Sequence, residues 1–429
     1  MREQYVIEGG RRLEGVVSVS GAKNAALPLI ISTILTSEPC RLRNVPDLED
    51  IAVTLRMLRM LGAKASFSGG VLDIETPSIA DTVAPYSLVK ALRASFWVLG
   101  PLLARVGEAR VALPGGDAIG SRPVDLHLKG LAALGADIRF SQGAVVAHAP
   151  GKLKGAKINL EYPSVGATHH LLMTAALVPG ETVLEGAARE PEVVALAELL
   201  SAMGAEIEGA GSSVVRIQGR SELGGAELRV IGDRIEAATY LIAGAMCAGN
   251  VTVDGISKDA MGATLDILSQ MGASIEAGEN SVAVCASDRL KAASFSTAPV
   301  PGLATDVQPL LMAAASIASG TSVITETVFD NRFGHVAEYR RLGADIELDG
   351  RTATVKGVDC LSGAPVEATD IRAAAGLVLM GLTAAGTTDL LEIHHLDRGY
   401  ETLTDKFCSL GAVIRRTPID EDRELVFGC

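Results

Sequence analysis

The sequence predicts an α/β protein of two domains, each built from three copies of one β-α-β-α-β-β-like unit. The main observation is a short pattern of Leu or Met, Gly and Ala that follows a helix-like stretch, precedes a strand-like stretch, and recurs six times. The chain's 429 residues are also too many for one ordinary core. The glycines at the centre of the pattern recur every 68 to 73 residues, at Gly62, Gly135, Gly204, Gly272, Gly343 and Gly411.

Each unit is expected to contain two helices. The segment before the central glycine, for example VVALAELLSAM, has apolar residues three and four apart, as an amphipathic helix does. The glycine would end this helix in a left-handed conformation, and alternating residues such as AEIEG would start a strand. Earlier runs such as EAATYLIAGAMCAG are apolar nearly all round, so we expect a second, buried helix, followed by a strand such as NVTVDG.

Composition narrows the class of function. Hydrophobic residues make up 48% and aromatic residues 3%, so the cores must be aliphatic. The net charge of −13 argues against a nucleic-acid partner, although a local arginine cluster can still bind a small anion. The six cysteines show no spacing typical of a metal site, so no metal or cofactor is predicted. Scattered thiols, no apolar signal region and no membrane-spanning run predict a soluble cytoplasmic protein with no membrane partner.

The residues that could do chemistry lie just before or after the expected buried helices. SVSGAKNAALP places Lys23 and Asn24 at a helix start, where free N–H groups and the helix dipole favour an anion. YPSVGATHH offers a second such start at residues 164–166. The remaining candidates are Arg93, Trp97, Asp117 and Arg122 in the first half, and Asp306, Arg332, Arg372 and Arg398 in the second half.

Several of these residues also have an ordinary structural interpretation. A lone Lys23 before a helix is usually solvated, Trp97 on an apolar helix is usually core, and Asp117 in a glycine loop usually forms a turn. Arg372 and Arg398 each have an aspartate nearby and could form simple ion pairs with Asp370 and Asp397.

The adjacent histidine pairs at 169–170 and 394–395 are predicted not to be ligands, because neighbouring side chains point apart. The arginines of the two halves would converge only if the two domains face each other across a cleft, around a ligand with several negative charges.

Motifs along the whole chain resemble those of the UDP-N-acetylglucosamine enolpyruvyl transferase family: SGAKNAALP, LRASFWVLGPLLAR, GGDAIGSRPVDLH, SVGAT, AAREPEV, DRIEAATY, TDVQ, ITETVFDNRF and HHLDRGYE. The EPSP synthases share the six-unit fold, but their lysine motif differs from SGAKNAALP. The resemblance implies two inside-out α/β domains, each of three βαβαββ repeats, with the active site in the interdomain cleft. The expected domains are residues 22–230, with the Asp117 loop, and residues 1–21 together with 231–429.

The resemblance also implies a reaction. The partners would be phosphoenolpyruvate and UDP-N-acetylglucosamine, whose 3-hydroxyl attacks C2 of phosphoenolpyruvate while C3 is protonated. Phosphate then leaves, and the enol ether forms. This would be the first committed step of peptidoglycan synthesis. Two alternatives stay open: an enolpyruvyl transferase acting on another acceptor, and a nucleotide-sugar-binding homologue without turnover.

The family pattern assigns a role to each candidate. Lys23 and Arg398 would contact phosphoenolpyruvate, Asp306 would take the hydroxyl proton, and Asp117 would be the acid. Residues 122–126 would bind uridine, residues 164–166 the diphosphate, and Val328 the sugar. The full set of expected binding residues is Asn24, Arg93, Trp97, Arg122, Pro123, Val124, Asp125, Leu126, Ser164, Val165, Gly166, Val328, Arg332 and Arg372.

Asp117 departs from the pattern, because most members of the family carry a cysteine there, on a mobile loop over the cleft. That thiolate is the group alkylated by fosfomycin, so an aspartate implies insensitivity to the drug. An ordinary aspartate is only about one-thousandth protonated at pH 7. A bound phosphate would raise its pKa and the arginines would lower it, and the sequence leaves that balance open.

Overall fold

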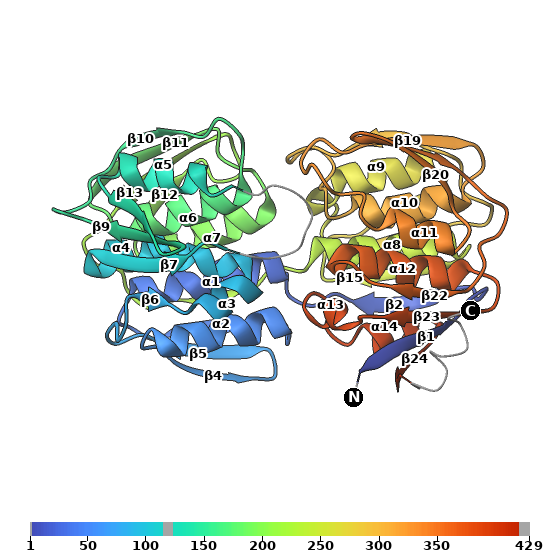
Figure 1. Cartoon of the computed structure of the whole chain (residues 1–429), viewed down its shortest axis with the longest axis horizontal. Helices are drawn as coiled ribbons and strands as arrows, with labels where there is room; N and C mark the ends of the chain where they lie inside the picture. Colours follow the sequence, from blue (N-terminus) through green and yellow to red (C-terminus); the bar gives the residue numbers. More distant parts are fainter. Residues whose placement is uncertain (1, 115–122, 420–429) are drawn as a thin grey trace. The chain divides into compact units, whose positions relative to one another are not determined.

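The structure is a computed structural model that describes residues 2–114 and 123–419. These residues form two compact units, one from residues 2–19 and 234–419, the other from residues 20–114 and 123–233 (Figure 1). The predicted domain boundaries, 21/22 and 230/231, lie within three residues of the points where the chain passes between the units. As boundaries of functional domains they remain a prediction.

The unit of residues 20–233 contains three successive repeats. The first comprises α1 (Lys23–Ser32), η1 (Thr33–Leu35), β3 (Cys40–Arg43), α2 (Glu49–Met60), β4 (Lys64–Ser68) and β5 (Val71–Glu75). The second comprises β6 (Val83–Ala84), α3 (Tyr86–Ala91), η2 (Arg93–Val98), α4 (Leu99–Val106), β7 (Glu108–Ala112), α5 (Asp125–Ala133), β8 (Asp137–Ser141) and β9 (Ala144–His148). The third comprises β10 (Lys157–Asn159), α6 (Val165–Ala176), β11 (Gly180–Glu185), α7 (Pro191–Ala202), β12 (Glu206–Glu208) and β13 (Val214–Gly219), and β14 (Glu227–Arg229) follows.

The other unit begins with β1 (Glu3–Glu8) and β2 (Glu14–Ser18) and resumes after residue 233. Its first repeat comprises α8 (Arg234–Met246), β15 (Asn250–Asp254), η3 (Lys258–Ala260), α9 (Gly262–Gln270), β16 (Ser274–Ala277) and β17 (Ser281–Cys285). The next comprises β18 (Phe295–Ser296), α10 (Gln308–Ile317), β19 (Thr321–Thr325), α11 (Val336–Arg341), β20 (Asp345–Asp349) and β21 (Thr352–Lys356). The last comprises β22 (Pro365–Glu367), α12 (Ile371–Thr383), β23 (Thr387–Leu391), α13 (His394–Asp397), α14 (Leu403–Ser409) and β24 (Val413–Pro418).

The described strands form six four-stranded sheets that share one topology. In each sheet the first strand is parallel to the second, and the remaining two are antiparallel, as in β10-β11-β13-β12. Three sheets are completed by strands distant in sequence. β1 pairs with β23 and β24, β2 lies parallel to β15, and β14 lies parallel to β3. The six-fold repeat and the α/β class predicted from the glycine spacing are therefore confirmed.

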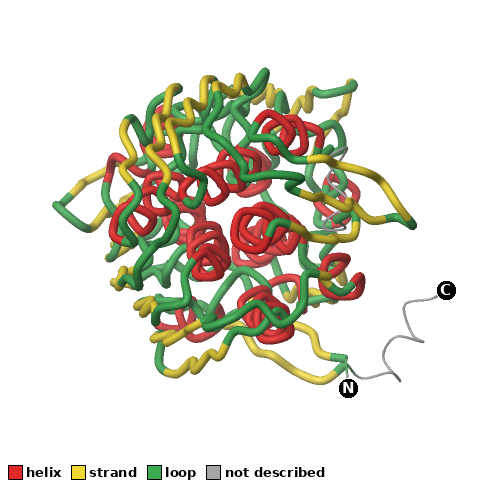
Figure 2. Tube along the Cα trace, turned by 90° about the vertical axis from the view of Figure 1, so that its left-hand side faces the viewer, coloured by secondary structure: helices red, strands yellow, loops and turns green. Residues whose placement is uncertain are grey.

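In every repeat but the second, the first long helix is almost entirely buried, as its all-round apolar sequence predicts. α8, α10 and α12 pack against one another in one unit, and α1, α6 and α7 in the other. Strands such as β13 alternate buried and exposed residues, so the sheets cover the helices with one face and meet solvent with the other. Figure 2 shows helices surrounded by strands in this inside-out arrangement.

The six pattern glycines end the second helix of each repeat with φ between 95° and 113°. This is the left-handed region that residues with a Cβ adopt only at a cost, which confirms the expected helix stop. The second repeat differs from expectation, because its apolar run is broken into α3, η2 and α4 instead of forming one helix. No described helix is long and apolar enough to cross a membrane.

Candidate functional site

Lys23 is the first residue of α1 and is buried, not solvated. Its Nζ lies 3.2 Å from Oδ2 of Asp50, a residue of α2 that is 2% exposed. Its backbone N–H donates to Oδ2 of Asp233 at 3.2 Å, so a carboxylate caps the first turn of the helix. The ordinary interpretation of Lys23 as a solvated residue is thereby wrong, because its ammonium is buried and paired with Asp50. Asn24 follows it and is half-buried.

Three segments of the same unit meet at the start of α6. Ser164 is the N-cap of this helix, and its hydroxyl accepts the backbone N–H of Ala167 at 3.3 Å. A methyl group placed on Gly166 would lie 3.5 Å from Trp97 Nε1 and 3.5 Å from His127 Nε2. Two ring N–H groups thus stand beside the free backbone N–H groups of a helix start. We call residues 93–97, 123–127 and 164–166 the α6 cluster.

The predicted members of the α6 cluster come from η2, α5 and α6. Arg93 is the first residue of η2, and its Nη2 donates to the carbonyl of Pro123 at 3.4 Å. Trp97 is half-buried, and its ring meets that of His169 edge-on, with centroids 5.3 Å apart. Val124, Leu126 and Val165 pack partly on the core, whereas the carboxylate of Asp125 is 52% exposed near Lys129.

His127 is a member of the α6 cluster that the sequence analysis did not select. The N–H of Gly100, in the first turn of α4, donates to Nε2 of His170 at 2.8 Å. The proton of His170 is therefore on Nδ1, which lies 3.0 Å from Nδ1 of His127. His127 must accept there and carry its own proton on Nε2, the nitrogen nearest Gly166. The signal in the sequence was the histidine that ends the motif GGDAIGSRPVDLH.

Burial keeps these rings neutral. It lowers the pKa of His127 to about 3, and the guanidinium of Arg93 adds to the effect. Burial also lowers the pKa of His169 to about 4 and holds that of His170 well below its ordinary value. The α6 cluster consequently offers neutral N–H donors near neutral pH.

The second group of predicted residues lies in the other unit, around the starts of α10 and α12. Asp306 stands two residues before α10, with its carboxylate 35% exposed. Arg372, in the first turn of α12, is buried and donates from Nε to Oδ1 of Asp306 at 3.0 Å. A buried guanidinium thus fixes the orientation of a partly exposed carboxylate.

Asp370 organises the first turn of α12. Its Oδ1 accepts the backbone N–H groups of Arg372 and Ala373 at 2.9 and 3.1 Å, as an N-cap does. The same oxygen lies 3.4 Å from Nη1 of Arg332, whose side chain is 2% exposed. The simple ion pair considered between Asp370 and the Arg372 side chain is wrong, because that guanidinium binds Asp306 and Asp370 binds its backbone.

Arg398 follows α13 and is half-buried. The next two residues contact Arg372: a methyl group on Gly399 would lie 3.8 Å from Arg372 Nη1, and the Tyr400 ring centroid lies 5.6 Å from its Cζ. Asp397, considered as a partner of Arg398, is bound through both oxygens by Arg416 at 2.8 and 2.9 Å. Val328 is half-buried, and its backbone N–H donates to Glu326 at 2.7 Å.

Asp117 and Arg122 lie outside the described residues. The expectation that adjacent histidines point apart is wrong for His394 and His395, whose rings stack with centroids 4.2 Å apart. Both belong to the short helix α13, where the two rings lean together.

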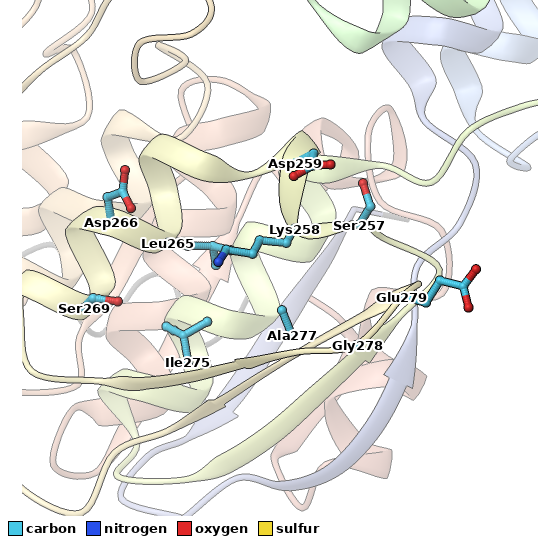
Figure 3. A pocket seen from close by; sticks show the side chains of 10 residues that line it. All are labelled: Ser257, Lys258, Asp259, Leu265, Asp266, Ser269, Ile275, Ala277, Gly278 and Glu279. Atoms are coloured by element: carbon cyan, nitrogen blue, oxygen red, sulfur yellow. The ribbon is translucent and has the colours of Figure 1, made fainter.

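A hollow of about 520 Å³ lies in the unit of residues 234–419, between η3, α9 and the β16–β17 hairpin (Figure 3). Its lining includes Lys258, Asp259, Asp266 and Glu279. None of the residues predicted from the sequence lines it, and its mixed charges do not converge on one point. We therefore do not assign the candidate site to this hollow.

Comparison with known proteins identifies the same family that the sequence motifs resemble. The sequence profile of EPSP synthase (3-phosphoshikimate 1-carboxyvinyltransferase) matches residues 7–407. Proteins named UDP-N-acetylglucosamine 1-carboxyvinyltransferase from Geobacter metallireducens and Geotalea uraniireducens are 51% and 50% identical over 414 residues, which cover 96% of this chain and 99% of each relative.

The solved structures that are similar to this chain are also enolpyruvyl transferases or EPSP synthases. The enolpyruvyl transferase NikO from Streptomyces tendae matches with a TM-score of 0.88 and 30% identity, over 98% of this chain and 100% of that one. An EPSP synthase from Acinetobacter baumannii, with a TM-score of 0.77 and 21% identity over 97% of this chain and 100% of its own, supports the fold alone. The chain therefore belongs to the EPSP synthase family and, within it, to the UDP-N-acetylglucosamine 1-carboxyvinyltransferases.

Proposed function

We propose that the protein transfers the enolpyruvyl group of phosphoenolpyruvate to the 3-hydroxyl of UDP-N-acetylglucosamine and releases phosphate. The observation that carries this proposal is the 51% identity to a relative of that name over 96% of the chain. The reaction would be the first committed step of peptidoglycan synthesis, in the cytoplasm, and would support cell growth, shape and division. Neither a metal ion nor a cofactor takes part.

Asp306 is the proposed base for the sugar hydroxyl. A general base needs a carboxylate that is reachable by substrate yet fixed in direction. Asp306 meets both conditions, because its carboxylate is 35% exposed and is held by Arg372 Nε at 3.0 Å. As the hydroxyl attacks C2, its proton moves to Asp306, and C3 of phosphoenolpyruvate receives a proton. The tetrahedral phospho-ketal then loses a C3 proton and phosphate, which restores the double bond.

Lys23, Arg122 and Arg398 are proposed to hold phosphoenolpyruvate, whose phosphate and carboxylate require cationic donors. The position of Lys23 supports this role, because its side chain belongs to the first residue of α1, where the positive end of the helix dipole adds to the charge of the ammonium. Arg93, Arg332 and Arg372 complete the positive surroundings. Since these residues come from both units, each unit contributes side chains to one reaction.

The α6 cluster is proposed to receive the UDP moiety. A helix start with free N–H groups at residues 164–166, flanked by the ring N–H groups of Trp97 and His127, suits a diphosphate. Residues 122–126 would bind uridine, and Val328 of the other unit would contact the sugar.

One assay tests the function. Phosphate release from phosphoenolpyruvate is measured with UDP-N-acetylglucosamine, with other UDP-sugars and with no acceptor, and the product is identified by mass spectrometry. We expect release only with UDP-N-acetylglucosamine and a product heavier by one enolpyruvyl group. Preference for another acceptor would favour the paralogue alternative, and binding without release would favour a non-catalytic homologue.

Asp117 is the proposed acid for C3, in the position that cysteine holds in most members of the family. A carboxylate is a hard nucleophile, so fosfomycin should leave the protein active and unmodified. Asp117→Cys should retain activity and become sensitive, and Asp117→Ala should lose most activity. A drug adduct on Asp117 of the natural protein, seen by mass spectrometry, would contradict the insensitivity. Full activity of Asp117→Ala would contradict the role as acid.

A further inference from the structure

Glu326 directly follows β19 and is one of the most buried charged residues described, with 1% of its surface exposed. A carboxylate in such a place is costly unless its oxygens are hydrogen-bonded. Glu326 lies inside the motif ITETVFDNRF but is not among the residues predicted from the sequence. Its contacts show why a charge is buried there.

One oxygen of Glu326 holds the segment that follows β19. Oε1 accepts the backbone N–H of Val328 at 2.7 Å and that of Phe329 at 3.0 Å. It also accepts the hydroxyl of Thr297 at 2.9 Å. Two successive N–H groups directed at one carboxylate oxygen fix the backbone that carries Val328, the predicted sugar contact.

The other oxygen holds the segment that leads into α10. Oε2 accepts the hydroxyl of Thr305 at 2.9 Å, and Thr305 immediately precedes Asp306. Thr297 strengthens the link, because its hydroxyl also accepts the backbone N–H of Thr327 at 2.9 Å. One buried carboxylate therefore joins the loop of the proposed base to the loop of the proposed sugar contact.

We propose that Glu326 is a positioning residue that fixes Asp306 and the Val328 segment relative to each other. The inference rests on the proposed function, because the two segments matter together only if one sugar meets both. Glu326 touches neither substrate. It acts through Thr305 on the base and through the backbone N–H groups of Val328 and Phe329 on the sugar.

Three variants separate the two links. Thr305→Val keeps the shape of the side chain but removes the hydroxyl, so only the link to Asp306 is lost. Glu326→Gln keeps an acceptor for Val328 and Phe329, and its amide can donate to Thr305. Glu326→Ala removes both links. Glu347→Gln on exposed β20 is the matched control.

The effect of each variant on kcat and KM is measured by steady-state kinetics with UDP-N-acetylglucosamine. Glu326→Ala should lower kcat about 100-fold, because a small misplacement of a reacting group has an effect of that size, and should also raise KM. Thr305→Val should lower kcat about tenfold by the same reasoning and leave KM within about twofold. Glu326→Gln should restore KM and most of kcat, and Glu347→Gln should match the natural protein.

Amide hydrogen exchange provides a readout that does not depend on turnover. In Glu326→Ala, protection should fall in residues 303–307 and 327–330 and stay unchanged in α8 and α12. Unchanged kinetics and exchange in a folded Glu326→Ala would overturn the inference. If that variant does not fold, an unchanged kcat in Thr305→Val overturns it. An inactive natural protein would count against the proposed function alone, and the exchange pattern would then decide the positioning role.

Discussion

The two units share one architecture and differ in the chemistry at the starts of their buried helices. In the unit of residues 20–233, α1 begins with a paired lysine, and α6 begins beside neutral histidine and tryptophan rings. In the other unit, α10 and α12 begin beside two buried arginines and the carboxylates of Asp306 and Asp370. At these helix starts one unit presents neutral N–H donors and a buried lysine–aspartate pair, and the other presents arginine–aspartate pairs.

We infer that the two units take different parts in the reaction. The candidate residues lie at the starts of α1 and α6 in one unit and of α10 and α12 in the other, and the residue types at these starts differ. Neutral donors suit recognition of a nucleotide, which must bind and leave, whereas paired charges suit the control of a proton. Substitutions and changes of pH should therefore affect the two units differently, both in the property that changes and in the size of the change.

The largest effect should follow from breaking the Lys23–Asp50 pair. Lys23→Met removes the proposed charge-assisted contact to phosphoenolpyruvate and should lower kcat/KM about 100-fold or more. It also deprives a buried carboxylate of its ammonium, which should reduce the free energy of unfolding by an amount on the order of 3 kcal/mol. Steady-state kinetics and chemical denaturation measure the two effects separately.

The double variant Lys23→Met with Asp50→Asn separates stability from function. Because the buried negative charge of Asp50 is gone, the free energy of unfolding should recover, while turnover should stay low. Turnover that returns with stability would show that Lys23 has only a structural role. The two units would then differ less in their part in the reaction than we propose.

Acid should destabilise the unit of residues 20–233 more than the other. Its described part buries His127, His169 and His170 with lowered pKa values, whereas the other buries His335, whose pKa burial lowers to about 3. Below the ordinary value of 6.5, the unfolded chain binds protons that these folded rings do not, so stability falls as pH falls. From pH 6.5 to 5.5, each such histidine should cost about 1 kcal/mol.

Amide hydrogen exchange at the two pH values measures this difference after correction for the intrinsic exchange rate. Protection in α5 and α6 should fall more than protection in α11 and α12. Equal loss in the two units, or greater loss in α12, would contradict the expectation that three buried neutral histidines make the unit of residues 20–233 more sensitive to acid than one makes the other unit.

A smaller effect should follow from changing His170, which accepts the backbone N–H of Gly100 and donates to His127. In His170→Asn, the amide nitrogen takes the place of Nδ1 and still donates to His127. In His170→Gln, the side chain instead reaches Gly100 and the donor to His127 is lost. We expect His170→Gln to weaken binding of UDP-N-acetylglucosamine about tenfold, the effect of one hydrogen bond, and His170→Asn to weaken it less. Equal affinities of the two variants, measured by calorimetry, would show that His127 does not contribute to nucleotide binding.

The sequence predicted most of the fold because its signals are local and repeated. A glycine with positive φ every 68 to 73 residues marks a helix end wherever it occurs, and apolar runs mark buried helices. The break of the second repeat into α3, η2 and α4 was not predicted, because hydrophobicity alone does not distinguish one helix from three. Gly100 explains part of it, since a methyl group there would lie 2.0 Å from Thr174 Oγ1, and α4 packs tightly on α6.

The candidate site was predicted less completely. Lys23, Gly166 and Arg372 lie at helix starts, which the sequence marks directly. His127 and His170, which are in contact, are 43 positions apart, and Glu326 binds Thr305, 21 positions before it, so no local pattern reveals these contacts. The ion pairs considered for Arg372 with Asp370 and for Arg398 with Asp397 did not form for the same reason, because residues that are close in sequence need not be in contact.

We propose that the α6 cluster of one unit recognises the nucleotide and that Asp306 of the other unit takes the hydroxyl proton. Two variants, compared side by side, test this proposal: Gly166→Ala, whose methyl group would meet His127 and Trp97 at ordinary contact distance, and Asp306→Asn. For each, calorimetry gives the affinity for UDP-N-acetylglucosamine, and phosphate release gives kcat on the same sample.

We expect Gly166→Ala to lose affinity, because its methyl group occupies the space beside the N–H groups of α6, and to keep kcat at saturating substrate. Asp306→Asn should keep its affinity and lower kcat by a factor on the order of 1000, since it removes the general base. The reverse pattern, with binding lost in Asp306→Asn and turnover lost in Gly166→Ala, would contradict the division of the reaction between the two units.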